Sequence, residues 1–220
     1  MMKTLRIPLL HDLEEQDLDT ALELQGERFT VDNVNWPESY PYAPFCCGRI
    51  ARTEDSLVVD WRVSGLDLRV RNLQDRGRIW EDSACEIFIQ PREGGEYFNF
   101  EVNPAGRLVA ARGAGREGRE SLTDEQFASI VRIVSIEGLD AASEEGGTDR
   151  GGLWGWRVVL LIPFDILGLD PDALPAEVRG NIYKCGDLTG HPHFVSWAPV
   201  GTEKPDFHRP EFFGEFRLTE

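Results

Sequence analysis

The chain has 220 residues, of which 41% are hydrophobic, so a packed core is expected and disorder of the whole chain is excluded. Its 39 acidic residues outnumber 23 basic ones and give a formal net charge of −16. Such a surface repels phosphate backbones and anionic lipid, which makes nucleic acid and membranes poor candidate partners. A neutral ligand carries no such electrostatic penalty.

The first fifty residues predict an irregular N-terminal extension, rich in proline toward its end, packed on the rest of one domain spanning 1–220. The apolar stretch at the start is short and is broken by Pro8, so it is a poor signal peptide. No apolar run of about 18 residues predicts a membrane-spanning helix. The expected location is cytoplasmic, or secreted or periplasmic if a leader has been removed.

From Leu57 onward the sequence predicts β-strands. Leu57, Val59, Trp61 and Val63 alternate with less apolar residues, which is the pattern of a half-buried strand. Residues 84–90 are rich in β-formers, and residues 96–103 alternate between apolar and polar side chains.

The second half continues in the same style. Further strand-like runs cover 107–111, 127–136, 154–162, 179–187, 193–199 and 213–218. Residues 113–125 and 139–152, rich in Gly, Glu, Ser and Arg, predict solvated loops. Helical periodicity is scarce and short. The predicted fold is all-β, an antiparallel β-sandwich of immunoglobulin-like or jelly-roll-like architecture with long loops and few short helices.

The four cysteines do not indicate a zinc cluster or a disulfide framework. Cys46 and Cys47 are adjacent, and no pair of cysteines is separated by two residues. Cys85 and Cys185 lie inside strand-like runs, where we expect them to be buried as small hydrophobic side chains.

Two tryptophans are candidates for stacking on a sugar ring. Trp80 lies in a polar stretch before a strand, and Trp197 ends a strand-like run just before Pro199. Flat aromatic faces bind the C–H faces of sugars, and two indoles can enclose one ring. The alternative is that both are core residues, as we expect for Trp61, Trp154 and Trp156. Trp36 cannot be placed from the sequence.

Polar residues of two predicted strands are candidates for hydrogen bonds to sugar hydroxyls. Glu86 interrupts the apolar run of residues 84–90, while Asn99, Glu101 and Asn103 share one strand face. The alternative is an ordinary solvated face of an antiparallel sheet.

A catalytic interpretation must use the same carboxylates. The chain has no nucleophile elbow, phosphate-binding loop, zinc-protease motif or dinucleotide-binding glycine pattern. Glu86 and Glu101 could form the acid pair of an enzyme acting on a sugar. His191 and His193 are more typical of a turn entering a strand than of half a metal site, and His208 has no evident triad partner.

Over about residues 55–220 the chain resembles a known protein family, in four segments that occur in the same order along the chain. They are WEDSACEIFI (80–89), YFNFEVN (97–103), GNIYKCGD (180–187), and HFVSW (193–197) running into PDFHRPEFFG (205–214). Together they resemble the family 9 carbohydrate-binding modules, and most closely the free-standing family 9-like branch.

The resemblance implies a DOMON-like β-sandwich whose ligand is carbohydrate, a mono- or oligosaccharide end held between two tryptophans without catalysis. It places the tryptophans at Trp80 and Trp197, a sugar-bonding glutamate at Glu86 and a nearby aromatic ring at Phe207. Glu101 stands where the family has an arginine, which leaves open a protein-interaction domain that has lost sugar binding. Structural calcium is implied as a possible cofactor, and such modules normally accompany a glycosidase.

Overall fold

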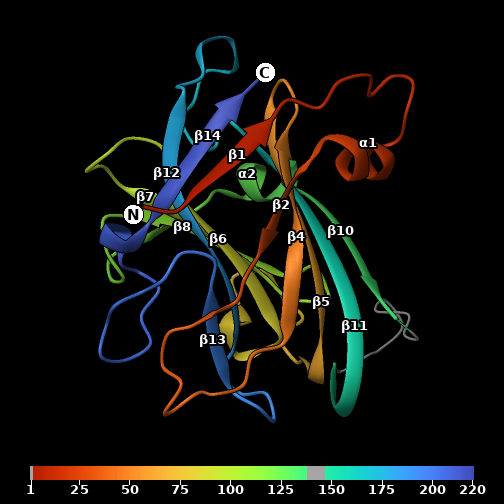
Figure 1. Cartoon of the computed structure of the whole chain (residues 1–220), viewed down its shortest axis with the longest axis vertical. Helices are drawn as coiled ribbons and strands as arrows, with labels where there is room; N and C mark the ends of the chain where they lie inside the picture. The colour runs from red at the N-terminus through yellow and green to blue at the C-terminus, as the bar shows by residue number, and fades with distance from the viewer. Residues whose placement is uncertain (1, 138–146) are drawn as a thin grey trace.

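The computed structural model describes residues 2–137 and 147–220 of the chain. Within these ranges the chain forms two β-sheets that pack face to face around one large hydrophobic core (Figure 1). All pairings between strands are antiparallel except the one between β1 and β14. The predicted β-sandwich is therefore confirmed.

Nine strands of the described residues form the larger sheet and five form the smaller one. The larger sheet contains, in spatial order, β1 (Thr4–Pro8), β14 (Gly214–Thr219), β12 (Glu177–Gly186), β6 (Ala84–Gln90), β7 (Tyr97–Val102), β8 (Leu108–Gly113) and β9 (Glu120–Ser121), while β13 (His193–Ser196) pairs with β12 and with β3 (Asn33–Val34). The smaller sheet contains β10 (Val131–Ile136), β11 (Thr148–Pro163), β5 (Ser56–Val70), β4 (Phe45–Arg52) and β2 (Glu27–Thr30).

Helical segments are short. They are α1 (Leu18–Gln25), α2 (Asp124–Ser129) and three single 3-10 turns, Ile79–Glu81, Pro171–Ala173 and Pro210–Phe212. In the described part of the chain, no helix has the length and apolar character needed to cross a membrane.

Alternation along the strands builds the core as the sequence predicts. Leu57, Val59, Trp61 and Val63 of β5 all point inward, and Trp156 of β11 joins them. Because successive strand residues face opposite sides, these apolar side chains meet the inward residues of the other sheet. Trp154 packs at the edge of this core and is only partly buried.

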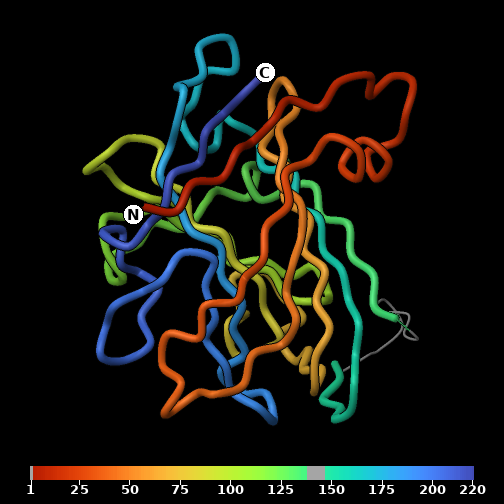
Figure 2. Tube along the Cα trace, in the orientation of Figure 1, coloured from red at the N-terminus to blue at the C-terminus, as the bar shows by residue number. Residues whose placement is uncertain are grey.

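Residues 1–50 are not an irregular extension, contrary to our expectation. They contribute β1 and β3 to the larger sheet and β2 and most of β4 to the smaller one, as the red and orange part of the trace shows (Figure 2). The connection between β3 and β4 contains Trp36, which is buried and donates its indole N–H to the Thr202 carbonyl at 2.7 Å. The connection between β3 and β4 therefore lies beside the loop that contains Thr202.

The two predicted loops differ in outcome. Residues 113–125 are mostly loop but contain β9 and the start of α2. In the second stretch, residues 138–146 lie outside the described part of the chain, and β11 begins at Thr148. The end of the predicted loop is therefore the beginning of a strand, with a shift in its pairing register between Arg150 and Leu153.

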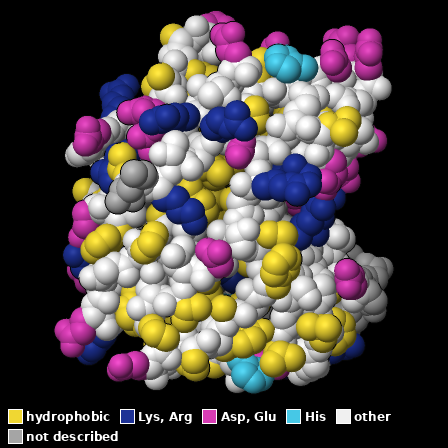
Figure 3. All heavy atoms as spheres, in the orientation of Figure 1, with side chains coloured by type: hydrophobic (Ala, Val, Ile, Leu, Met, Phe, Trp, Pro, Cys, Tyr) yellow, Lys and Arg dark blue, Asp and Glu magenta, His cyan; other side chains and the backbone are white. Residues whose placement is uncertain are grey.

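Charged side chains of both signs are interspersed on the face shown in Figure 3. Apolar side chains gather at the lower end of this face, near the ends of β4, β5 and β11 (Figure 3). Phe45, Leu66 and Leu153 of these strands have exposed fractions of 64%, 43% and 75%. Because acidic and basic side chains are interspersed, the acidic residues on this side do not form a single continuous patch.

Helix α1 covers part of the outer face of the smaller sheet. Asp17 caps its N-terminus by accepting a hydrogen bond from the Thr20 amide at 2.8 Å. Its apolar side packs Ala21 and Leu22 against a small cluster that includes Val58 and Val159. The helix thus buries outward-facing apolar residues that the sandwich core cannot reach.

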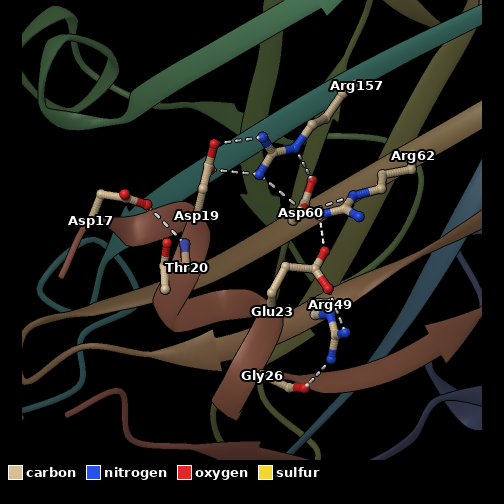
Figure 4. A network of polar contacts seen from close by, with 9 residues as sticks. All are labelled: Asp17, Asp19, Thr20, Glu23, Gly26, Arg49, Asp60, Arg62 and Arg157. Atoms are coloured by element: carbon tan, nitrogen blue, oxygen red, sulfur yellow. Dashed lines mark hydrogen bonds and ion pairs between the residues drawn. The ribbon is translucent and has the colours of Figure 1, made fainter. Parts of the chain in front are cut away.

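A network of charged groups fixes the other side of α1 (Figure 4). Asp60 of β5 has no exposed side-chain surface, and its oxygens accept from Arg157 at 2.8 Å and from Arg62 at 3.1 Å. Arg157 also donates to Asp19 of the helix, at 2.8 and 3.0 Å. Glu23 of the helix pairs with Arg62 and with Arg49 of β4. Asp60 is the buried centre of this network.

We expect Asp60→Ala to lower the free energy of unfolding by about 3 kcal/mol, because two arginines would lose their buried counter-charge. Asp19→Ala removes an exposed partner of the same Arg157 and should cost less than about 1 kcal/mol. Urea unfolding of both variants measures the difference. Equal losses in the two variants would contradict the central role of Asp60.

Candidate functional site

A pocket of about 330 Å³ opens on the outer face of the larger sheet. Its floor is formed by alternate residues of four neighbouring strands, β6, β7, β8 and β12. The floor residues are Glu86, Asn99, Glu101, Val109, Ala111 and Cys185. The walls are formed by Trp80, Asp187 and Phe194 on one part, by Arg116 and Arg119 on another, and by the 205–208 segment on a third. Phe194 belongs to β13 and Trp80 to a 3-10 turn, while the other wall residues lie in loops.

Strand alternation brings two glutamates together on this floor. Glu86 of β6 and Glu101 of β7 are direct cross-strand partners. Their chain neighbours Ile87 and Phe100 point into the core, so both carboxyls must face outward into the pocket. Both glutamates are buried, with exposed fractions of 3% and 5%. The fold therefore holds two carboxyls beside each other, shielded from solvent.

Burial raises the pKa of each of these carboxyls. The pKa of Glu86 lies well above its usual range, through burial and then through the charge of Glu101. The pKa of Glu101 rises to about 7 through burial, although an Asn99 hydrogen bond and the charge of Arg119 oppose the rise. Asp187 on the pocket wall is half-buried, and burial raises its pKa to about 6.

The carboxyl oxygens differ in their hydrogen bonds. Cys185 donates its thiol to Glu86 Oε1 at 2.9 Å, and Asn99 donates its amide to Glu101 Oε1 at 2.8 Å. Glu101 Oε2 is buried and has no hydrogen-bond partner among the described residues. One acceptor of the pocket floor is therefore left for a ligand.

Arg119 closes one side of the pocket, and its side chain is fully hydrogen-bonded to neighbouring protein groups. Its Nε donates to Asn99 Oδ1 at 2.9 Å, and its guanidinium lies 4.3 Å from the Tyr97 ring centroid. Its two terminal nitrogens donate to four backbone carbonyls, those of Tyr97, Ala111, Gly113 and Gly115. These contacts join β7, β8 and the loop after β8, and they leave no N–H of Arg119 for a ligand.

Aromatic rings line the remaining walls. Trp80 is half-buried at the rim, where the 3-10 turn Ile79–Glu81 presents it. Phe207 is stacked on Tyr183 with ring centroids 4.1 Å apart, so it is a fixed wall residue. Phe194 of β13 is half-buried and contacts Phe207 at 6.1 Å between centroids.

His208 is a neutral member of the wall. Its Nδ1 lies 2.9 Å from the Tyr97 hydroxyl in a hydrogen bond. Burial, with the nearby charges of Arg119 and Arg116, lowers the pKa of His208 to about 3. The ring therefore carries no charge at neutral pH.

Trp197 does not face Trp80, so the predicted two-tryptophan clamp is wrong. Its ring is 2% exposed and lies in the core, 5.5 Å from the Phe216 ring centroid. Gly214 makes room for it, since a Cβ there would lie 2.4 Å from the indole. The reason is alternation: Trp197 follows Val195 by two residues and shares its inward face.

The other predicted residues divide between the pocket and the fold. Trp80, Glu86, Asn99, Glu101 and Phe207 all line the pocket. Asn103 does not: it is fully buried beyond the end of β7, where its amide donates to Asp82 and to the Asn72 carbonyl. Asn103 therefore holds a turn together and is not available to a ligand.

Several residues that line the pocket were not predicted from the sequence. Arg116 and Arg119 lie in a stretch that we expected to be a solvated loop, and nothing in its composition marks Arg119 as buried. Phe194 could have been found, because the alternation that buries Val195 points Phe194 to the opposite face. Asp187 ends a predicted strand without any distinguishing pattern.

The buried cysteines behave largely as expected. Cys85 and Cys185 are both buried, which confirms that prediction, although the Cys185 thiol also serves Glu86. Within residues 2–137 and 147–220, no three His, Cys, Asp or Glu side chains are grouped so that they could hold a metal ion. The calcium implied by the resemblance stays a prediction.

Comparison with known proteins identifies the family. A model of carbohydrate-binding family 9 matches residues 16–218, so the chain belongs to that family. No curated protein matches the sequence.

Several solved structures are similar to this chain, and three of them illustrate the range of similarity. A Bacteroides uniformis ATCC 8492 protein, provisionally described as carbohydrate-binding, is 32% identical, with a TM-score of 0.88 over 99% of this chain and 100% of that one. A family 9 module from Caldicellulosiruptor kristjanssonii in complex with glucose is 11% identical, with a TM-score of 0.57 over 98% and 95%. The same module with cellotriose is 9% identical, with a TM-score of 0.58 over 99% and 94%. The last two show the fold alone.

We expect Glu101→Gln to stabilise the protein at alkaline pH. A carboxyl whose pKa rises from 4.5 to about 7 on folding favours the folded state in acid and loses that contribution as the pH rises through 7. Removing the charge should therefore raise the free energy of unfolding at pH 8 by on the order of 2 kcal/mol, and by much less at pH 5.

Urea unfolding at the two pH values gives this difference directly. Glu54→Gln, in the exposed turn between β4 and β5, is the matched control and should show no such pH dependence. A variant at Glu101 that is equally stable to wild type at pH 8 would show that this carboxyl carries no charge cost.

Proposed function

We propose that this protein binds carbohydrate without catalysis and holds a mono- or oligosaccharide end in the pocket on the larger sheet. The observation that carries the proposal is a half-buried tryptophan, Trp80, beside a floor of carboxyl and amide groups, in a chain that belongs to carbohydrate-binding family 9. Sugars need both a flat apolar surface for their C–H face and fixed acceptors for their hydroxyls.

Trp80 is the stacking platform in this proposal. The second aromatic surface comes from Phe194 and Phe207, which line the same pocket, and not from Trp197. Phe207 is well suited to a fixed wall because Tyr183 and Trp36 hold its ring, at centroid distances of 4.1 and 6.2 Å. A rigid wall loses little side-chain entropy when a ligand binds.

The floor supplies hydrogen bonds that orient the ring. Glu86, Glu101 and Asp187 can accept from sugar hydroxyls, and Asn99 retains one amide hydrogen after its bond to Glu101. The volume of about 330 Å³ lies at the lower end of the roughly 300–1,000 Å³ of ligand pockets. We therefore expect one or two sugar rings inside, with any longer chain extending into solvent.

The known complexes support this class of ligand. The Caldicellulosiruptor kristjanssonii module of the same family is described with glucose and with cellotriose. We expect a dissociation constant between about 1 μM and 1 mM, about −4 to −8 kcal/mol, for a shallow site with few contacts.

We expect Trp80→Ala to weaken sugar binding at least about tenfold at only a small cost in stability, since the ring is half-buried at the edge of a hydrophobic cluster. Trp197→Phe is the matched variant and should do the reverse. It should keep the affinity and lower the free energy of unfolding by at least about 1 kcal/mol, because it leaves a cavity in the core.

Titration of both variants with glucose and cellotriose, followed calorimetrically, decides between the two tryptophans. Loss of binding in the Trp197 variant alone would contradict the proposed site. If the wild-type protein binds neither these sugars nor others on a glycan array, the alternative of a protein-interaction domain without sugar binding is favoured.

A catalytic role for Glu86 and Glu101 is less consistent with the geometry. The two carboxyls of a glycosidase flank the bond that is cleaved. Here they are cross-strand neighbours on one sheet face, so both approach a ligand from the same side. We expect no turnover of aryl glycosides or lactones. Turnover that disappears in Glu86→Gln would instead establish an enzyme.

A further inference from the structure

The floor of the pocket offers a ligand more hydrogen-bond acceptors than donors. Arg119 is its most buried cation, and all of its N–H groups are used within the fold. Arg116 is exposed and donates to Asp206 at 3.3 Å. The Nδ1 of His208 is bonded to the Tyr97 hydroxyl, which leaves its Nε2 on the wall. On the buried floor, the polar groups left for a ligand are the carboxyls of Glu86 and Glu101 and one hydrogen of Asn99.

Three carboxyls of the pocket form no direct ion pair in the described part of the chain. Among the residues that the structure describes, Glu86, Glu101 and Asp187 form no ion pair with any lysine or arginine. Glu101 is only 5% exposed, and its Oε2 has no hydrogen-bond partner in residues 2–137 and 147–220. A buried carboxylate without a directly paired counter-charge is costly, and the raised pKa values of all three groups express that cost even though cations lie nearby.

A ligand can remove this cost in two ways. A sugar hydroxyl donates one hydrogen bond but brings no charge. A protonated amine donates up to three hydrogen bonds and also supplies the missing positive charge, and charge-assisted hydrogen bonds are about twice as strong as neutral ones. The rim adds Trp80, whose ring face favours a nearby cation.

We infer that the pocket selects a sugar carrying a protonated amine, such as a 2-amino-2-deoxyhexose or an oligosaccharide ending in one, over the neutral parent sugar. This inference rests on the proposed function and names its ligand class. Glu101 and Asp187 are the groups that receive the ammonium, and Trp80 takes the C–H face of the ring. An N-acetylated sugar lacks the charge and should bind like a neutral sugar.

The test compares three monosaccharide probes, glucose, glucosamine and N-acetylglucosamine, at a pH where the glucosamine amine is protonated. Calorimetry of the wild-type protein should give glucosamine roughly a tenfold advantage over the other two. The advantage should shrink with added sodium chloride, because an ion pair at a pocket open to solvent is screened. The affinity for glucose should change little with salt.

Two variants assign the preference to the pocket. Glu101→Gln and Asp187→Asn each keep the shape and a hydrogen-bonding group and should bring glucosamine down to the affinity of glucose. Asp187 is half-buried, so its variant remains informative if the buried change at Glu101 disturbs folding. Glu54→Gln makes the same charge change at an exposed turn and should keep the full preference.

The outcomes separate this inference from the proposed function. Equal binding of glucose and glucosamine would overturn the amine preference and leave sugar binding intact. A preference that survives in both pocket variants would overturn the assigned residues. Binding of none of the three probes, nor of their oligosaccharides, would overturn the proposed function and the inference with it.

Discussion

The site depends on one constraint, the alternation of side chains along β6 and β7. Ile87 and Phe100 are buried in the sandwich core, so Glu86 and Glu101 have no choice but to face outward beside each other. The core thus stabilises an arrangement that the two carboxyls themselves oppose. The cost of burying them appears as raised pKa values, to which the charge of Glu101 adds at Glu86, and Glu101 Oε2 has no hydrogen-bond partner among the described residues.

The outer face of a sheet is normally solvated, and here the connections convert it into a pocket. Arg119 ties the loop after β8 to the backbone of β7 and β8 and so builds one wall. The 205–208 segment builds another, held by the stacking of Phe207 on Tyr183. Arg119 therefore holds the wall in place, and the carboxyls of Glu86 and Glu101 remain on the floor as acceptors.

Comparison of Trp80 with Trp197 shows how far pattern reasoning extends. Both tryptophans stand at the ends of strand-like runs, and the family resemblance gives them one role. The register decides otherwise, since Trp197 shares the inward face of Val195 while Phe194 turns toward the pocket. The sequence shows that successive residues of this strand alternate between its two faces. Which face packs in the core depends on the strands that pair with it.

The sequence by itself determined the sandwich, the inward faces of β5 and β7, and the outward placement of Glu86, Asn99 and Glu101, because period-two alternation is local and needs no partner. It did not reveal that residues 1–50 complete both sheets, that Asn103 holds a turn, or that Arg119 closes the pocket. Those features were decided by tertiary structure, since they join residues far apart in the chain whose contacts depend on loop paths and strand order.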